Sequence, residues 1–277
     1  MTHDLARLAD RLRQLHAGPG PLILPNAWDV ASARAFAALN VSAIATTSAG
    51  VAESLGYEDG ETAPADAMLA AVASMAAAIG DLPLTADLEG GYGLAPRDLV
   101  DRLLATGAVG LNLEDTDHRG GGLLRADAQA QRIAAVKAAG HSAGVDIVVN
   151  ARVDVFIREV GAPETRMDEA LRRARRYVEA GADCVYPIWL ADETEIATFV
   201  AGVAAPVNIY ARDAAPPIRR LAELGVRRVT FGSGLFQAAM TAAVTRFGEV
   251  RRGSADEQED ERNDRRGGVD HEVDHDE

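Results

Sequence analysis

Short apolar segments alternate with longer segments of helical character along almost the whole chain, from residue 22 to residue 247. Eight of the short segments have the length and composition of strands buried on both faces; they cover residues 22–24, 43–47, 82–88, 110–114, 146–153, 184–189, 206–210 and 228–231. Helical patterns follow them at 29–39, 64–79, 96–106, 126–139, 165–180, 192–203, 215–224 and 234–247. This repeated alternation predicts an α/β protein with a parallel sheet.

The number of repeated units decides between the two common folds of this class. Eight strand–helix units in roughly 250 residues predict a single (β/α)8 barrel, the TIM barrel. The competing fold is an open doubly wound sheet. It is disfavoured because the first strand runs into PNAWD at residues 25–29 and not into a G-x-G-x-x-G turn. Four leucines at helical spacing predict an extra N-terminal helix over residues 2–16.

A change of composition divides the chain near its end. Residues 1–250 are predicted to form one barrel domain. Residues 251–277 contain eleven acidic side chains, five arginines and almost no apolar side chains, which predicts a disordered acidic tail.

The overall charge and the cysteine content limit the partners and the compartment. The formal net charge of −14 argues against DNA or RNA as a partner, because a nucleic-acid interface needs a basic face. Cys184 is the only cysteine, so no internal disulfide is possible and a reducing, cytoplasmic compartment is expected. The N-terminus has no signal-peptide pattern, and no apolar run reaches the ~18 residues of a membrane span.

The segment at residues 84–93 carries two acids into a glycine-rich turn. Side chains alternate along a strand, so Asp87 and Glu89 are expected to share a face. Buried carboxylates need a cation or hydrogen-bond donors, and Mg²⁺ prefers carboxylate and water oxygens. The pattern therefore predicts a magnesium site, with an edge strand bearing solvated acids as the alternative.

Polar residues also end the other predicted strands, where the site of a barrel lies. Glu114 ends the fourth strand and would complete the metal site with Asp87 and Glu89. Arg152, on the fifth strand, offers a planar fork for a carboxylate or phosphate, or else a salt bridge to Asp154 or Glu114 that only supports the barrel.

A second anion site is expected after the second predicted strand. Ser48 and the backbone N–H groups of Ala49 and Gly50 would cradle an anionic group. The alternative for Ser48 is a helix N-cap.

Seven segments together resemble the isocitrate lyase / phosphoenolpyruvate mutase superfamily over about residues 20–248. They are PNAWD (25–29), TSAG (47–50), LGYED (55–59), DLEGGYG (87–93), NLED (112–115), NAR (150–152) and GAD (181–183). The resemblance implies a (β/α)8 barrel that binds Mg²⁺ and acts on 2-oxo or 2-hydroxy acids through an enolate-like intermediate. It also implies a homotetramer whose subunits exchange their last helix.

The resemblance assigns roles to individual residues. Asp87 resembles the direct magnesium ligand, and Glu89 and Glu114 resemble acids that reach the metal through water. Asp59 resembles a further acid of that shell. The substrate would be bound by the remaining matched residues, Ser48, Ala49, Gly50, Arg152 and Asn208.

The segment after the fourth strand departs from the family pattern and limits the reaction. Isocitrate and methylisocitrate lyases carry a cysteine there, whereas this chain reads TDHRGGGL at residues 116–123. The loop also lacks the lysine and asparagines of the phosphonate-handling members. His118 or Arg119 would act on the substrate from this loop, and its three glycines would let the loop close over the substrate. The alternative for His118 is a solvent-exposed loop position.

These residues predict a Mg²⁺-dependent carbon–carbon lyase that cleaves or decarboxylates a small 2-oxo or 2-hydroxy (di)carboxylic acid. Arg152, Asp59 and His118 are the expected catalytic residues. Two alternatives remain open: phosphorus–carbon chemistry of the phosphonomutase or phosphonopyruvate hydrolase type, and a barrel that has lost catalysis.

Overall fold

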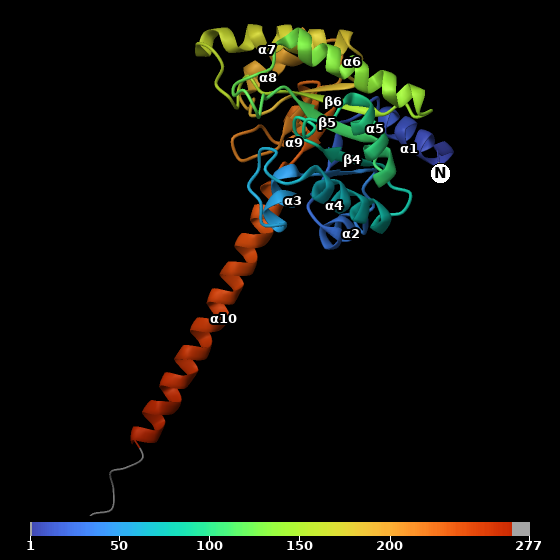
Figure 1. Ribbon diagram of the computed structural model, residues 1–277. Helices are drawn as coiled ribbons and strands as arrows, with labels where there is room; N and C mark the ends of the chain where they lie inside the picture. Colours follow the sequence, from blue (N-terminus) through green and yellow to red (C-terminus); the bar gives the residue numbers. More distant parts are fainter. Residues whose placement is uncertain (1, 268–277) are drawn as a thin grey trace, which may run out of the picture. The chain divides into compact units, whose positions relative to one another are not determined.

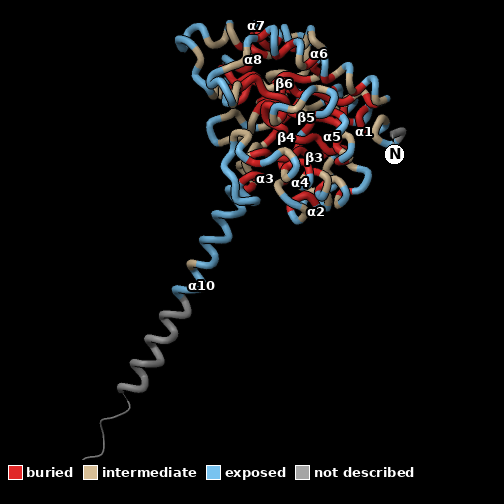
Figure 2. Tube along the Cα trace, in the orientation of Figure 1, coloured by how far each residue is buried: buried red, intermediate tan, exposed pale blue. Residues whose placement is uncertain are grey.

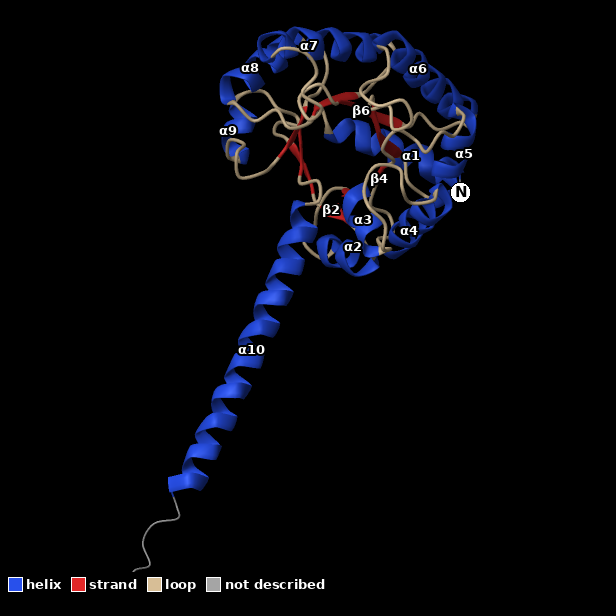
Figure 3. Ribbon diagram, turned by 60° about the vertical axis from the view of Figure 1, so that its left-hand side comes forward, coloured by secondary structure: helices blue, strands red, loops and turns tan. Residues whose placement is uncertain are grey.

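The strands form a closed ring, seen in Figure 3, and the TIM barrel predicted from the sequence is confirmed. Figure 1 labels the elements along the chain. The computed structural model describes residues 2–267, with side chains for 4–252. The strands are β1 (Leu22–Leu24), β2 (Asn26–Ala27), β3 (Ile44–Thr46), β4 (Leu84–Asp87), β5 (Gly110–Glu114), β6 (Val148–Val153), β7 (Cys184–Pro187), β8 (Asn208–Tyr210) and β9 (Arg228–Thr230). All neighbouring strands are parallel.

The ring closes at two places where few backbone hydrogen bonds join the neighbouring strands. β1 and β2 flank Pro25 and act as one barrel strand: β1 pairs with β9, β2 pairs with β3, and the Pro25 carbonyl accepts the Ala45 N–H. Proline has no N–H to donate, which accounts for the break between the two short strands. A parallel bridge between Val185 and Val207 joins the β7 side of the ring to β8.

Helices α2 and α4–α9 follow the strands in turn and lie outside them (Figure 3). They are α1 (Thr2–Leu15), α2 (Val30–Ala37), α3 (Ser48–Ser54), α4 (Ala65–Ala78), α5 (Pro96–Thr106), α6 (Ala126–Ser142), α7 (Pro163–Glu179), α8 (Glu193–Gly202), α9 (Ile218–Glu223) and α10 (Gly234–Gly267). α3 has no counterpart among the predicted helices. Thr47 caps it by accepting the Gly50 N–H at 3.4 Å, so the alternative role of Ser48 as the N-cap is wrong.

The core lies between the ring of strands and the surrounding helices, and Figure 2 shows the strands as the most deeply buried part. α1 covers the N-terminal end of the barrel: a Cβ on Gly110 would lie 2.9 Å from Leu12 Cδ2, so glycine is needed where the helix meets β5. Arg13 of α1 also pairs with Asp183 at 2.9 Å. The opposite, C-terminal end of the strands is left for a site.

The chain divides into two compact units, Met1–Leu235 and Phe236–Glu277. α10 is helical as far as Gly267, although a disordered tail is predicted from residue 251. Arginine and glutamate are good helix formers, and residues 251–267 are rich in both. Residues 268–277 lie outside the described part of the chain, so the extent of a disordered tail stays a prediction. None of the helices described is both long and apolar enough to cross a membrane.

Acid is expected to destabilise the barrel through His16, which is 4% exposed beside α1. Burial, with Arg228 nearby, lowers the pKa of His16 from 6.5 to about 4. The unfolded chain therefore takes up a proton at a higher pH than the native protein does. Stability contributed by neutral His16 is complete above pH 6.5 and is lost as the pH falls toward 4, by up to about 3 kcal/mol. Urea unfolding between pH 7 and 4 should show a smaller loss for His16→Gln; an unchanged slope would contradict the prediction.

Candidate active site

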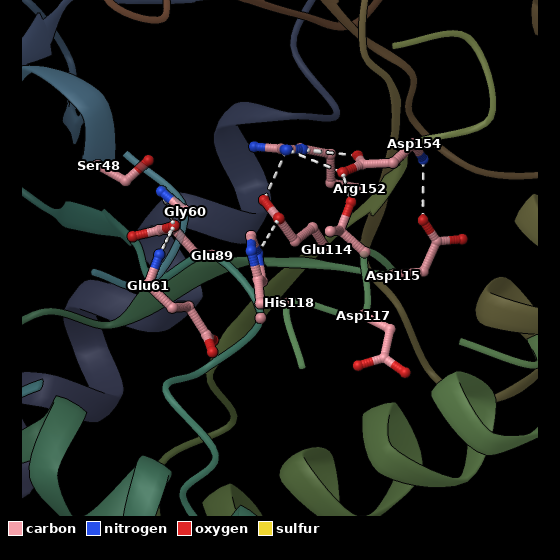
Figure 4. A network of polar contacts seen from close by, with 12 residues as sticks. Ser48, Gly60, Glu61, Glu89, Glu114, Asp115, Asp117, His118, Arg152 and Asp154 are labelled. Atoms are coloured by element: carbon pink, nitrogen blue, oxygen red, sulfur yellow. Dashed lines mark hydrogen bonds and ion pairs between the residues drawn. The ribbon is translucent and has the colours of Figure 1, made fainter. Parts of the chain in front are cut away.

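Acidic and basic side chains converge at the C-terminal ends of β4, β5 and β6 (Figure 4). Asp87 ends β4 and Glu114 ends β5, and Glu114 is the register partner of Arg152 in β6. Parallel strands in register bring these residues to one rim, as the sequence predicts.

Asp87 is held on one side and unsatisfied on the other. Its Oδ2 accepts the Ser48 backbone N–H at 3.4 Å and the Ser48 hydroxyl at 3.2 Å, and its own N–H donates to Thr46 Oγ1 at 2.9 Å. Its Oδ1 is buried and has no hydrogen-bond partner. A buried carboxylate oxygen without a donor is costly unless a cation meets it. The Asp87 position therefore fits a cation ligand.

Glu114 lies between two basic groups. Its Oε2 is 2.6 Å from Arg152 Nη2, and its Oε1 is 2.6 Å from His118 Nε2. Burial raises the pKa of Glu114 to about 7, with Asp154 and Asp87 adding to the rise and Arg152 and the His118 hydrogen bond opposing it. The hydrogen bond to Glu114 raises the pKa of His118 above its ordinary value. Because the two side chains are in direct contact, they titrate as a pair.

Glu89 serves a neighbouring loop. Its Oε2 accepts the N–H groups of Gly60 at 2.9 Å and Glu61 at 2.6 Å, and its Oε1 accepts the Tyr92 hydroxyl at 2.7 Å. Burial raises its pKa to about 7, while the Tyr92 hydrogen bond opposes the rise. These contacts fix the loop that carries Asp59.

Asp59 is an exposed residue, but its carboxyl group interacts electrostatically with Asp87 and Arg152. Surrounding protein atoms and the Asp87 charge raise its pKa, and hydrogen bonds from Ser48 and Gly60 oppose the rise. Asp59 and Asp87 therefore share Ser48 as a neighbour, although they are 28 positions apart in the chain.

Arg152 uses the Nε–Nη2 edge of its guanidinium group for contacts with two acids. Its Nε donates to Asp154 Oδ1 at 2.7 Å and its Nη2 donates to Asp154 Oδ2 at 2.8 Å, in addition to the Glu114 contact. The salt bridges considered as an alternative role are therefore both present. None of these contacts uses Nη1, so binding an anion there remains compatible with the structure.

A buried network that the sequence does not reveal holds Asp154 from behind. Asp115 accepts the Asp154 N–H at 2.9 Å, and Asp115 is itself bonded by Arg173 Nη1 at 2.9 Å and by the Tyr177 hydroxyl at 2.6 Å. Thr116 donates to Asp154 Oδ2 at 2.5 Å. Arg173 belongs to an arginine-rich helix, and nothing in the local sequence separates this buried arginine from its exposed neighbours.

The loop after β5 folds back over the rim. A bridge between Thr116 and Leu123 closes its base, and His118, with a side chain only 11% exposed, reaches Glu114. The solvent-exposed position considered for His118 is therefore wrong. The loop lines a polar cavity of about 290 Å³ together with Glu61, Gly90 and Arg132.

Some predicted site residues remain apart from this cluster. Asn208 is fully buried in β8, where its Oδ1 accepts the Thr230 hydroxyl at 3.2 Å, and no described contact joins it to Asp87 or Arg152. Ala49 and Gly50 lie in the first turn of α3.

No three His, Cys, Asp or Glu side chains among residues 4–252 enclose a metal ion by themselves. One or two carboxylates completed by water, the set that Mg²⁺ commonly takes, nevertheless fit Asp87 and its acidic neighbours.

Asp154→Asn is expected to weaken substrate use through Arg152. An asparagine places an N–H donor against Arg152 or Thr116, both of which donate to Asp154. A misplaced arginine should raise KM and lower kcat/KM by about 10²-fold. Asp183→Asn is the matched control, since Asp183 pairs with Arg13 and Lys137 at the other end of the barrel. Equal kinetic losses in both variants would contradict a positioning role for Asp154.

Comparison with known proteins agrees with this geometry. A family model described as phosphoenolpyruvate phosphomutase matches residues 12–251. Uncharacterized protein Rv1998c of Mycobacterium tuberculosis is 36% identical over 242 residues, covering 85% of this chain and 88% of its own length. 2-Methylisocitrate lyase of Bacillus subtilis is 29% identical over 258 residues, covering 88% and 82%.

A crystal structure of a proposed phosphonomutase from Burkholderia cenocepacia J2315 superposes with a TM-score of 0.82 at 37% identity, covering 87% of this chain and 99% of that one. Relatives of this chain thus carry the names of lyases and of mutases. The chain belongs to the phosphoenolpyruvate phosphomutase family, within the superfamily that includes the isocitrate lyases.

Proposed function

We propose that this protein is a Mg²⁺-dependent lyase that cleaves or decarboxylates a small 2-oxo or 2-hydroxy (di)carboxylic acid through an enolate intermediate. The observation that carries the proposal is the buried, unpartnered Oδ1 of Asp87. It lies on the same rim as Arg152, an arginine with an unused Nη1, so a cation and an organic anion would meet there.

Asp87 would hold the metal directly, and Glu89, Glu114 and Asp59 would act on it through water. Mg²⁺, when bound, supplies stabilisation of the negative charge that develops on the enolate oxygen. The first turn of α3, with Ser48, Ala49 and Gly50, would bind the substrate carboxylate. Arg152 Nη1 would donate a hydrogen bond to an oxygen of the substrate and so orient it.

His118 and Glu114 are the proposed proton carriers. Their 2.6 Å contact and raised pKa values support this proposal, in which His118 Nε2 and Glu114 Oε1 would share one proton. Delivery of that proton to the enolate carbon would complete the reaction without the cysteine that isocitrate lyases carry on this loop.

A panel of 2-oxo and 2-hydroxy acids tests the proposal. Purified protein should turn over oxaloacetate or a 2-alkylmalate with Mg²⁺, and EDTA should abolish the reaction. Mg²⁺ with oxalate, an enolate mimic, should also raise the melting temperature by mass action. Full turnover in excess EDTA would overturn the metal role, and absence of both turnover and the thermal shift would overturn the enzymatic role.

Phosphorus–carbon chemistry is the second candidate, because the matching family model is that of phosphoenolpyruvate phosphomutase. The loop at 116–123 has neither lysine nor asparagine, which makes it the less favoured reaction. Formation of phosphate or phosphoenolpyruvate from phosphonopyruvate, with no action on the carbon acids, would reverse this order.

We also propose that copies of the chain associate through α10. Met240, Val244 and Phe247 repeat at helical spacing on α10 and are 50%, 69% and 68% exposed. The barrel unit has an apolar groove of about 710 Å³ whose lining includes Ile23 and Leu39. The helix of another copy would bury both surfaces, as the family resemblance implies for a homotetramer.

Phe247→Asp is expected to lower the oligomeric state, because it puts a charge into the apolar stripe of α10. Light scattering coupled to size exclusion measures the change, with Arg246→Asp on the same turn as the matched control. A tetramer that persists in Phe247→Asp would contradict the assignment of this helix.

A further inference from the structure

An arginine and a tryptophan stack on each other above β7 and β8, away from the acidic rim. Trp189 follows the end of β7 and Arg212 follows the end of β8, so both lie at the C-terminal end of the barrel. The guanidinium carbon of Arg212 is 4.5 Å from the centre of a Trp189 ring, and Arg212 Nη2 donates to the Trp189 carbonyl at 3.0 Å. The stack fixes the plane of the guanidinium group.

The backbone at Trp189 is strained. Its φ is +71°, a conformation that bulky side chains rarely adopt, and the residue remains 47% exposed. Strain of this kind costs of order 1–3 kcal/mol and concentrates at functional sites. Here it presents an indole face to Arg212.

Arg212 lacks a carboxylate partner. Among the described residues no Asp or Glu forms an ion pair with it, and its Nε is buried without a hydrogen-bond partner. The described side-chain hydrogen bonds of Arg212 use only Nη2. Arg152 and Arg173 are both paired with acids, whereas Arg212 is held by an indole face and one carbonyl, which leaves its charge free to bind an external anion.

Two tyrosines connect this arginine to the acidic rim. Tyr186 in β7 is the register partner of Arg152, and its surroundings include Asp87, Arg152 and Tyr210. Tyr210 ends β8, and Arg212, Asp213 and Ser233 all act on its hydroxyl. A Cβ on Gly232 would lie 3.2 Å from the Tyr210 ring, so the chain passes closely behind it. The path from Asp87 to Arg212 thus runs across one end of the barrel.

We propose that Arg212, held flat by Trp189, binds the second carboxylate of a dicarboxylic substrate. This rests on the proposed function: the first carboxylate and the 2-oxygen lie near Asp87 and Ser48, and the distal carboxylate accepts hydrogen bonds from Arg212. The substrate class narrows from 2-oxo or 2-hydroxy acids in general to diacids.

Binding measurements on matched acids test the subsite without turnover. Malate and 2-hydroxybutanoate have four carbons each and differ in the distal carboxylate; 2-hydroxyglutarate and 2-hydroxypentanoate form the five-carbon pair. With Mg²⁺ present, the wild-type protein should bind one diacid at least about tenfold more tightly than its partner. Arg212→Gln should remove that preference and leave the dissociation constant of oxalate within about twofold.

Matched variants keep the outcomes separate. Arg219→Gln removes the same charge from an exposed position of α9 and should change nothing. Arg212→Lys keeps the charge without the fork and should retain only part of the preference.

Oxalate bound normally with no preference for either diacid overturns the subsite alone. Equal weakening of oxalate and diacid by Arg212→Gln shows that the stack only ties two loops together, which also overturns it. Failure of the wild-type protein to bind oxalate with Mg²⁺ counts against the proposed function, and the subsite falls with it.

Discussion

Asp87→Asn is expected to abolish Mg²⁺-dependent turnover while leaving the barrel folded. The amide removes the negative charge that would hold the cation, and its oxygen can still accept from Ser48. Loss of the charge stabilisation at the reacting centre should lower kcat by roughly 10²–10⁴-fold. Initial rates at saturating substrate, with Mg²⁺ varied, give this value.

The thermal shift caused by Mg²⁺ with oxalate should disappear in the same variant, because it arises only from binding to the native site. Asp101→Asn is the control: it removes one carboxylate from the exposed face of α5 and should keep both rate and shift. Asp87→Asn protein that still responded to Mg²⁺ with the wild-type dependence would place the metal elsewhere and remove the basis of the proposed mechanism.

The sequence predicts the barrel well where local signals bound each element. Residues 96–106 are predicted and found as a helix with the same limits, because Pro96 fits the first turn and Gly107, with φ of +92°, ends it. The helix at Ser48–Ser54 is not predicted, because the same residues also fit an anion-binding loop. The pairing of β1 with β9 and of β2 with β3, on either side of Pro25, depends on the closure of the ring, which no local pattern records.

The site is predicted as far as strand ends determine it. Asp87, Glu114 and Arg152 meet because they end adjacent parallel strands. Glu89 does not follow the same rule: β4 ends at Asp87, and the φ of +49° at Glu89 turns the chain, so the alternation of a strand no longer applies. Asp59 and His118 lie on loops, where strand alternation predicts nothing. Asp59 is predicted only through the family resemblance.

The supporting network lies beyond local patterns for a different reason. Asp115 and Tyr177 are 62 positions apart, and their contact depends on how α7 packs against β6 and β7. A buried ion pair has no periodicity of its own. Only its burial distinguishes Arg173 from the exposed Arg172 next to it.

Arg152→Met is expected to cost more stability than any of the other substitutions considered. It leaves Glu114 and Asp154, whose side chains are 3% and 0% exposed, without their common cation. Removing one partner of a buried pair typically costs about 3–5 kcal/mol, because the remaining charge stays desolvated. Activity should also be lost, since methionine cannot bind a carboxylate.

The loss should depend on pH. Burial already raises the pKa of Glu114 to about 7, and without Arg152 that pKa rises further. A carboxyl group whose native pKa lies above its unfolded value destabilises the fold as the pH rises from the unfolded toward the native pKa. Arg152→Met should therefore lose more stability at pH 8 than at pH 5.5 in urea unfolding.

The double variant Arg152→Met/Glu114→Gln removes one of the two unpaired carboxylates and should recover part of the loss at pH 8. Arg152→Lys keeps the charge and should unfold nearly as the wild type does, with activity still reduced because the planar fork is gone. Equal losses at both pH values, with no recovery in the double variant, would show that Arg152 supports the barrel by packing and not by neutralising the acids of the rim.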